Sequence, residues 1–345
     1  MLYKEYITIS DMVLHKIGSN CCQEGVTYSN EIIKLDKDLQ ELLKTYFLRS
    51  FKSEEYYNFT HSSDINLNEI FHFASIIFKD KKTFLYVSKK IASYLYECSA
   101  HPNIKRGELY IVYFENCILN GETIDALGIF KSENKDKFIK IYDTSNGFGI
   151  EENEGISINR LDKGCLIFNS QKEDGFILSV VDNTNKTQGA EAKYWTEAFL
   201  HIKPRRDSFH QTNHIISICR DYSESPLLNQ GKLERISFMS RVLNSLSNDC
   251  NNVEELTNTL FDNDEERHKF SEYIKQYSKS ENLDLTGNIS LNTEVLKKET
   301  RKKSIIKLDK SFEIRLLTPS EKNIIKGFDS ERNQFFYTFF FNHES

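Results

Sequence analysis

The segment Ile104–Lys140 reads IKRGELYIVYFENCILNGETIDALGIFKSENKDKFIK, and it decides the fold that we predict. Two runs rich in β-branched and aromatic residues flank Asn120-Gly121, a dipeptide typical of the tight turn of a β-hairpin. The second run leads into Lys131–Lys137, which predicts a polar turn too charged to be buried. We therefore expect a core hairpin that ends in a polar loop, where a fold often displays its working groups.

Helical patterns precede this hairpin. Apolar residues recur at three- and four-residue steps within 32–51 and within 82–98. A second helix is expected between these two, capped by Asp64 or Asn66. A strand is expected within 5–17, ahead of all three helices.

Further β segments follow the hairpin at a spacing of about a dozen residues, which predicts an antiparallel meander. They are Phe138–Tyr142, Gly155–Ile158, Gly164–Phe168 and Phe176–Val181. The stretch between Gly147 and Gly155 is strongly acidic and would repel phosphate, which argues against a nucleotide-binding loop there.

The C-terminal part is predicted to be mostly helical. Helices are expected there at 231–247, 252–261 and 264–279, with a basic helix or turn at 290–303 and strands at Lys310–Leu317 and Gln334–Phe341; helical patterns at 194–200 and 209–222 precede this part. The run Phe335–Phe341 is so apolar that we expect a buried strand, with a partner-facing edge as the alternative.

These elements predict an α+β fold: N-terminal helices packed on an antiparallel β-meander, then a mostly helical C-terminal region with a short terminal β element. The length of 345 residues suggests about two domains. Ser223–Pro226 is the best linker candidate, so we predict an α+β core domain at 1–222 and a C-terminal region at 226–345.

Composition and charge narrow the class of protein. The net charge of −6 argues against a strong, nonspecific electrostatic mode of nucleic-acid binding. Charge is uneven, however, because residues 296–345 carry eleven Lys or Arg and seven Asp or Glu. The seven cysteines form no C-x-x-C pair, which favours reduced thiols in the cytoplasm. We recognise neither a signal peptide nor an apolar run of the ~20 residues that a transmembrane helix requires.

One candidate site is the constellation Asp125, Glu133 and Lys135. An acidic residue near a hairpin followed by Glu-x-Lys is the skeleton of a Mg²⁺-dependent nuclease, in which the carboxylates hold the metal and the lysine lies near the attacking water. Glu133 and Lys135 would share one face of a strand. A solvated turn or binding loop is the alternative interpretation, and the one we favour.

The second candidate site is cationic. On a helix, Lys297 and Arg301 would align at i, i+4, with Lys298 and Lys302 beside them, and form a face suited to phosphates. Paired arginines after an earlier helix could also grip phosphate oxygens. An ordinary solvated charged face remains the alternative. The candidate DNA-binding residues are Lys297, Lys298, Arg301, Lys302, Lys303, Lys307, Arg205 and Arg206.

Other catalytic signatures are weak. His210 and His214 have the i, i+4 spacing of helical metal ligands, with His201 nearby, but Gln211 stands where H-E-x-x-H requires Glu. No G-x-S-x-G motif occurs. We therefore predict no catalytic residue, metal or cofactor.

Three blocks of the sequence resemble the 37-kDa nucleoid-associated protein family of bacteria, particularly its Bacteroidetes-type members. They are Gly107–Tyr110 with Ile129–Lys135, Leu161–Asn169, and Val181–Asn183 with Tyr194-Trp195. The resemblance implies a cytoplasmic protein that co-purifies with compacted chromosomal DNA. It implies no established catalytic residues.

The leading hypothesis is therefore a nucleoid-associated protein that binds and organises double-stranded DNA without catalysis, possibly as a homodimer. A metal-dependent nuclease is one alternative. The other is a scaffold that reaches the nucleoid through another nucleoid protein, because the acidic body and aromatic tail suit a protein-binding surface.

Overall fold

The structure is a computed structural model. It describes residues 2–3, 6–53, 55–119, 121–184, 194–225, 231–248, 250, 252–280, 285, 287–301, 304–308, 312–316 and 324–343. The chain divides into two compact units, Met1–Arg205 and Arg206–Ser345, and each is described by itself.

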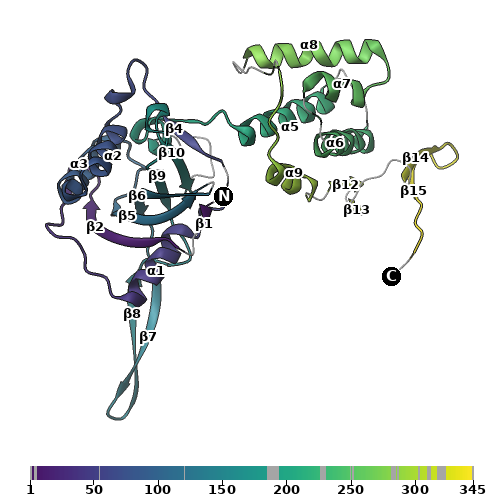
Figure 1. The fold of residues 1–345 in the computed structure, drawn as a ribbon. Coiled ribbons are helices and arrows are strands. Elements are labelled where there is room, and N and C mark those ends of the chain that lie inside the picture. Colours follow the sequence, from purple (N-terminus) through teal and green to yellow (C-terminus); the bar gives the residue numbers. More distant parts are fainter. Residues whose placement is uncertain are drawn as a thin grey trace. The chain divides into compact units, whose positions relative to one another are not determined.

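The first unit is built on an antiparallel sheet with the strand order β11-β4-β10-β9-β6-β5-β2-β3, and β1 pairs with β5 (Figure 1). Strands β5, β6, β9 and β10 form the predicted meander at its centre. The strands of this sheet are β1 (Leu2–Tyr3), β2 (Thr8–Ile17), β3 (Val26–Thr27), β4 (Tyr57–Phe59), β5 (Gly107–Leu119), β6 (Glu122–Ser132), β9 (Lys163–Phe168), β10 (Ile177–Asp182) and β11 (Ile202–Pro204).

The predicted hairpin is confirmed as β5–β6, with Leu119 opposite Glu122. Gly121 has a φ of 88°, a backbone conformation that glycine adopts without a Cβ clash, whereas Asn120 lies outside the described residues. Because side chains alternate along β5, Ile111 packs on one face of the sheet and Val112 on the other. Both are fully buried, so helices must cover both faces.

Helix α1 (Lys37–Leu48) covers one face and helices α2 (Glu69–Lys79) and α3 (Phe84–Cys98) cover the other. On the α1 side, the Phe47 ring stacks on Phe130 with centroids 4.4 Å apart. Burying one such side chain contributes about 1.5–3 kcal/mol. A turn of π-helix at Tyr194–Phe199 adds its aromatic rings to the α2–α3 side.

The cap of α2 differs from both residues that we predicted. Asn68 accepts the hydrogen bond from Phe71 N, while Asp64 caps a short 3₁₀ helix, Ile65–Leu67, just before it. Asn68 also donates to the carbonyl oxygens of Thr60 and Leu200. Its amide therefore joins the start of α2 to neighbouring backbone, a connection that local sequence does not reveal.

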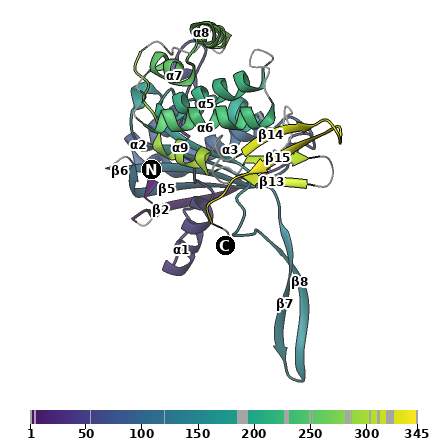
Figure 2. The ribbon, with the colours of Figure 1, turned by 90° about the vertical axis from the view of Figure 1, so that its right-hand side faces the viewer.

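Strands β7 (Asp136–Thr144) and β8 (Gly147–Gly155) leave the sheet as a separate two-stranded ribbon between β6 and β9. Figures 1 and 2 both show the ribbon projecting from the body of the first unit. Two predictions need correction here: Phe138–Tyr142 is a strand but does not belong to the meander, and β8 ends at Gly155, so no strand continues through Ile158. The acidic stretch between Gly147 and Gly155 is β8.

The second unit is mainly helical. Its core cluster is aromatic, with Tyr222 packed against Phe238, Phe261 and Phe270. Its elements are α5 (Ser208–Glu224), α6 (Lys232–Ser247), α7 (Val253–Leu260), α8 (Asp264–Ser280), α9 (Thr293–Thr300), β12 (Ser304–Leu308), β13 (Phe312–Leu316), β14 (Ile324–Asp329) and β15 (Gln334–Phe339). The predicted α+β class is confirmed.

The predicted buried strand at Phe335–Phe341 is wrong. β15 forms a hairpin with β14, and the side chains of Phe335, Phe336 and Phe339 are exposed. Ile324 and Tyr337 of this hairpin belong to a small apolar cluster with Leu233 and Ile306.

Ser223 and Glu224 of the predicted linker are the last residues of α5, Ser225 caps that helix, and Pro226 lies outside the described residues. Helix α5 contributes Ile215, Ile218 and Tyr222 to the core of the second unit. The division by contacts therefore falls one helix earlier, at Arg205 and Arg206. The domain ranges 1–222 and 226–345 stay a prediction.

Candidate functional site

The end of β6 is buried, which corrects the first part of the exposed polar turn predicted for Lys131–Lys137; Lys135 and Lys137 are exposed, as predicted. Lys131 and Ser132 are 0% and 1% exposed. The Lys131 ammonium donates to the carbonyl oxygen of Lys105 at 2.7 Å, to Glu133 Oε1 at 2.9 Å and to the Tyr194 hydroxyl at 3.2 Å. All three ammonium hydrogens therefore have an acceptor.

A second buried lysine lies directly opposite in the sheet, because Lys131 of β6 pairs with Lys163 of β9. Lys163 Nζ donates to both carboxylate oxygens of Asp182, at 2.8 and 2.7 Å, and to Thr184 Oγ1 at 2.6 Å. Like charges directly opposite are unfavourable. Here each ammonium has its own carboxylate, which removes most of that repulsion.

The Tyr194 ring is shared by the two lysines. Its centroid lies 5.5 Å from Lys131 Nζ and 5.1 Å from Lys163 Nζ, within the range of cation–π attraction. The Tyr194 hydroxyl donates to Glu133 Oε1 at 2.9 Å. We call Lys131, Glu133, Lys163, Asp182 and Tyr194 the buried charge cluster.

Asp162 fixes the chain just after β6. Its Oδ2 accepts from the backbone N–H groups of Glu133, at 2.7 Å, and Asn134, at 3.0 Å. Its Oδ1 accepts from the Asn134 side chain at 2.8 Å. The carboxylate therefore replaces the strand partner that this backbone lacks, and it orients Glu133 toward Lys131.

Burial controls protonation in this cluster. It lowers the pKa of Lys131, although Glu133 opposes that shift. Burial, followed by the nearby carboxylate of Glu133, raises the pKa of Tyr194 well above its ordinary value. At neutral pH Tyr194 is therefore a neutral hydrogen-bond donor. With every charge paired, the cluster holds the ends of β6 and β9 together.

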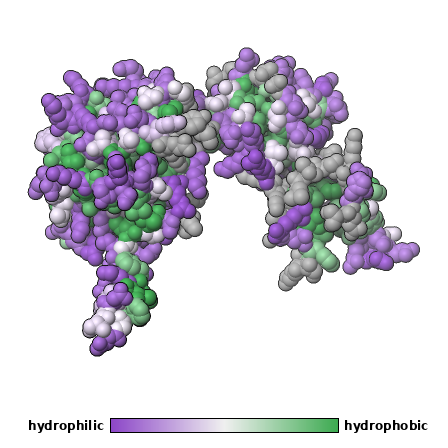
Figure 3. All heavy atoms as spheres, turned by 60° about the horizontal axis from the view of Figure 1, so that its bottom comes forward, coloured by the Kyte–Doolittle hydropathy of each residue, from purple (hydrophilic) through white to green (hydrophobic). Residues whose placement is uncertain are grey.

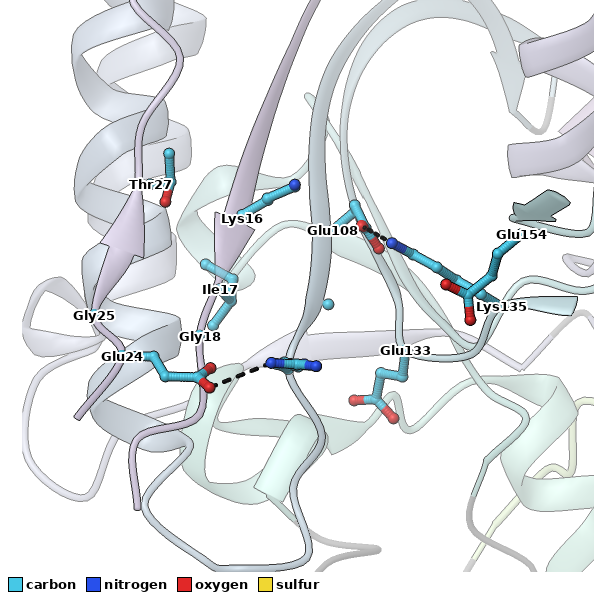
Figure 4. Close-up of a pocket in the computed structure, with 12 residues that line it drawn as sticks. Lys16, Ile17, Gly18, Glu24, Gly25, Thr27, Glu108, Glu133, Lys135 and Glu154 are labelled. Atoms are coloured by element: carbon cyan, nitrogen blue, oxygen red, sulfur yellow. Dashed lines mark hydrogen bonds and ion pairs between the residues drawn. The ribbon is translucent and has the colours of Figure 1, made fainter. Parts of the chain in front are cut away.

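A cleft of about 500 Å³ opens beside the cluster (Figure 4). Glu133, Glu108 and Lys135 lie on one part of its wall and Glu24 on another, and Arg106 also lines it. Ion pairs join Lys135 Nζ to Glu108 at 2.8 Å and Arg106 to Glu24 at 3.3 Å. Because these cations already have carboxylate partners, the cleft offers little net attraction for phosphate.

The structure does not assemble the nuclease constellation. Asp125 and Glu133 lie eight residues apart, and the strand rises about 3.3 Å per residue, so roughly 26 Å separates their backbones. The Asp125 carboxylate accepts from the Tyr113 hydroxyl at 2.7 Å, and Lys135 pairs with Glu108. Within the described ranges, no three His, Cys, Asp or Glu side chains gather around a possible metal position.

The two histidines of α5 contact each other. His210 and His214 have Nε2 atoms 2.9 Å apart, and burial, together with His214, lowers the pKa of His210. Asp207 nearby caps α5 by accepting from His210 N at 3.1 Å. His201 belongs to the first unit.

The cationic candidate lies on α9. Asn292 caps this helix by accepting from the backbone of Glu294 and Val295. Val295 and Leu296 are buried in the core of the second unit. The exposed side chains of Lys297 and Lys298 on α9, and of Arg301 at its C-cap, lie away from this core.

Carboxylates lie close to some of the cations on this side of α9. Lys297 Nζ lies 3.1 Å from Glu294, and both side chains are more than half exposed. Such a pair contributes little, because water screens it. Glu299 of α9 instead pairs with Arg220 of α5 at 2.9 Å, which ties the two helices together. Lys298 and Arg301 have no ion-pair partner within the part of the chain that the structure describes.

The other predicted DNA-binding residues are placed only in part. Lys302 and Lys303 lie outside the described residues, and Lys307 belongs to β12 but its side chain is not described. Arg205 ends the first unit, where its N–H donates to the carbonyl oxygen of Tyr56. Arg206 is exposed and begins the second unit.

Sequence reasoning missed the buried charge cluster. Lys163, Asp182 and Tyr194 all lay inside the blocks that carried the family resemblance, yet we assigned them no role. One signal was available. Lys131 directly follows the apolar residues Ile129 and Phe130, so a buried strand that continues one residue past Phe130 also buries Lys131. The Lys105 carbonyl, Tyr194 and Asp182, which complete the hydrogen bonding of the two lysines, come from distant segments.

These observations define a two-part protein, with a helix-covered antiparallel sheet and a helical unit that presents a cationic helix. The family model described as nucleoid-associated protein YejK matches residues 13–331. The chain therefore belongs to this family of nucleoid-associated proteins. No match was found among curated proteins. In the parts of the chain that the structure describes, none of the helices has the length and apolar character needed to cross a membrane.

Proposed function

We propose that this protein acts in the bacterial cytoplasm, where it binds double-stranded DNA of the nucleoid directly and organises it without catalysis. Family membership supports the association with the nucleoid. The observation that carries direct DNA binding is the solvent-facing surface of α9, with Lys297, Lys298 and Arg301 on one short, anchored helix.

The geometry of α9 suits a polyanion. Lys297 and Arg301 lie one turn apart and therefore point along the same face, with Lys298 adjacent. A rigid helix holds these charges in place because its other side is packed into the core. DNA phosphates are closely spaced, so neighbouring cations can neutralise several at once and release their counterions. Lys302, Lys303 and Lys307 follow directly in the sequence and would extend the surface.

The chemistry of the first unit supports a role without catalysis. Asp125 and Glu133 are too far apart to share a metal ion, and the Glu133 carboxylate already accepts from Lys131 and Tyr194. A group that is bound in this way is poorly placed to activate water.

The test is titration of a labelled DNA duplex with the full chain across a salt series. We expect affinity to fall steeply with salt. The variant Lys297→Ala/Lys298→Ala/Arg301→Ala should bind several-fold more weakly and have a shallower slope, by about 2 to 3 in log K against log salt. Adding Lys302→Ala and Lys303→Ala should flatten the slope further.

A matched control removes the same charge from another helix of the same unit. Lys269, Lys275 and Lys279 are exposed on α8, and their replacement with Ala should leave the slope nearly unchanged. Equal effects in the two triple variants would contradict a specific role for α9. A plasmid-nicking assay with Mg²⁺ or Mn²⁺ on the same sample should show no cleavage; cleavage that Glu133→Ala abolishes would overturn the non-catalytic role.

A scaffold that reaches the nucleoid through another protein is the second candidate function. The exposed rings of Phe335, Phe336 and Phe339 on β15 favour it, because exposed aromatic side chains are common in protein interfaces. The same titration separates the two functions. A scaffold would show no duplex binding at any salt concentration.

A further inference from the structure

The ribbon β7–β8 exposes an apolar face. Ile139, Ile141, Phe148 and Ile150 share that face, because Ile139 is followed by Ile141 two residues on and Ile141 lies opposite Ile150. They are 70%, 66%, 78% and 71% exposed. Figure 3 shows apolar surface along this projecting ribbon. A two-stranded ribbon is marginally stable alone in water, so such a surface indicates a binding partner.

The charge of the ribbon excludes DNA as that partner. Between Asp136 and Gly155 there are two lysines and five carboxylates. The two lysines are already paired within the ribbon: Lys137 with Glu152 at 2.7 Å and Lys140 with Glu151 at 3.2 Å. A segment with three surplus negative charges repels phosphate.

The sequence of β7 is nearly palindromic. Residues 137–143 read KFIKIYD. Ile139 and Ile141 flank Lys140, Phe138 and Tyr142 come next, and Lys137 at one end is opposite in charge to Asp143 at the other. A strand that pairs antiparallel with a copy of itself places residues at equal distances from its centre opposite one another. This pattern is therefore complementary to itself in both polarity and charge.

The outer edge of β7 is available for such pairing. Among the described residues, β7 pairs with β8 and with no other strand, so one edge of its backbone lacks a strand partner. We propose that β7 pairs antiparallel with β7 of a second copy of this chain, with Lys140 at the two-fold axis. The result is a four-stranded sheet that crosses the homodimer.

This register produces favourable cross-strand neighbours. Ile139 lies beside the partner's Ile141 and Lys137 beside the partner's Asp143, and the two-fold axis repeats each pair. The Lys140 side chains meet at the axis, where Glu151 of each chain offsets their repulsion. Lateral contact between the isoleucine rows removes part of their surface from water.

The aromatic rings on the opposite face of the ribbon are compatible with this pairing of two β7 strands. The Tyr142 ring lies over Gly149 and the Phe138 ring lies beside Gly155, each on the neighbouring strand, where a Cβ would collide with or press against the ring. These rings are thus directed toward β8 and leave the outer edge of β7 open. The two glycines serve this packing.

Sedimentation equilibrium of the full chain tests the proposal. We expect a monomer–dimer equilibrium for the natural sequence. Lys137→Asp and Asp143→Lys should each weaken dimerisation about tenfold, because each places like charges opposite one another twice in the dimer. The double variant Lys137→Asp/Asp143→Lys should restore the dissociation constant to within about twofold.

A control variant distinguishes the contact between Lys137 and the partner's Asp143 from the ion pair that Lys137 makes with Glu152 of its own chain. Glu152→Gln removes the own-chain partner of Lys137 but leaves the edge of β7 unchanged, so dimerisation should stay within about twofold. Circular dichroism establishes that each variant is folded. A natural chain that stays monomeric, or swaps that fail to rescue each other, would overturn the proposal.

The register has an independent test. Residues opposite one another across antiparallel strands have Cα atoms about 4.5–5.5 Å apart, within reach of a disulfide. Lys140→Cys should therefore cross-link to itself between copies under mild oxidation. Glu151→Cys on β8 should not, and peptide mapping separates these links from any through the exposed Cys21 and Cys22. Equal cross-linking of the two variants would refute the register.

Discussion

The end of β6 buries a charged side chain, whereas the ribbon that follows it exposes apolar side chains. This is the reverse of the usual relation between hydropathy and burial. Lys131 is fully buried, whereas Ile139, eight residues later, is 70% exposed. Both segments are β-strand, so the difference does not come from local conformation. The comparison teaches that the available partners decide burial.

The partners of the two segments can be named. Around Lys131, Glu133 two residues later supplies a carboxylate, and two distant segments supply the Lys105 carbonyl and the hydroxyl and ring of Tyr194. Around Ile139, the chain has left the sheet, and neither α1 nor the α2–α3 pair reaches the ribbon (Figures 1 and 2). A charged side chain can be buried where all its hydrogen-bond and ion-pair partners are present. An apolar side chain stays exposed where no second layer of helices or strands covers it.

The largest effect is expected from breaking the buried pair. Lys131→Ala leaves Glu133, whose side chain is 6% exposed, without its counter-ion. We expect the free energy of unfolding to fall by about 3–5 kcal/mol, measured by urea denaturation. Lys135→Ala is the control, because its pair with Glu108 is partly exposed and should cost less than about 1 kcal/mol. Equal losses would contradict our account of the cluster.

A buried but neutral polar group should show an intermediate effect. His15 Nδ1 accepts from Ser29 N at 3.1 Å, so Nε2 carries the hydrogen and donates to Ser88 Oγ at 3.0 Å. Burial, together with the nearby charge of Lys89, lowers the pKa of His15 to about 4. Between pH 6.5 and 4 the unfolded chain therefore takes up a proton that the folded chain refuses, and stability falls as the pH falls.

The full shift corresponds to about 3 kcal/mol lost between pH 7 and pH 4. His15→Gln cannot take up this proton. Its unfolding free energy should therefore depend less on pH than that of the natural chain, by about that amount, in denaturant titrations at both pH values. Identical pH dependence in the two proteins would show that His15 is not the group responsible.

The smallest effect is expected on the ribbon. Ile139→Thr and Ile150→Thr should change the unfolding free energy of the first unit by less than about 0.5 kcal/mol, because both side chains are already exposed. Ile129→Thr makes the same chemical change inside the core and should cost more than about 2 kcal/mol. Similar losses in all three variants would mean that the ribbon packs against the body.

Local patterns predicted much of the fold. The turn at Gly121 and the flanking β-rich runs identified the central hairpin, and helical periodicity located α2 and α3, because both signals act between near neighbours. The ribbon was misassigned because β7 carries the same alternation as a strand of the main sheet. The local sequence of β7 does not indicate which strand it pairs with.

The candidate site was predictable to a smaller degree. The cationic face of α9 follows from helical spacing and is found where expected for Lys297, Lys298 and Arg301. The nuclease constellation failed because adjacency in sequence suggested proximity, whereas an extended strand separates Asp125 from Glu133. The buried charge cluster depends on contacts between β6, β9 and the Tyr194 segment, which no single stretch encodes.

By itself, the sequence determined the α+β class, the hairpin and the cationic helix, because these depend on contacts between residues close along the chain. Only the tertiary structure decided which charges are buried and which apolar residues face water. Those outcomes depend on side chains that meet from distant segments, and the free energy of burying a charge changes sign with the presence of its partner.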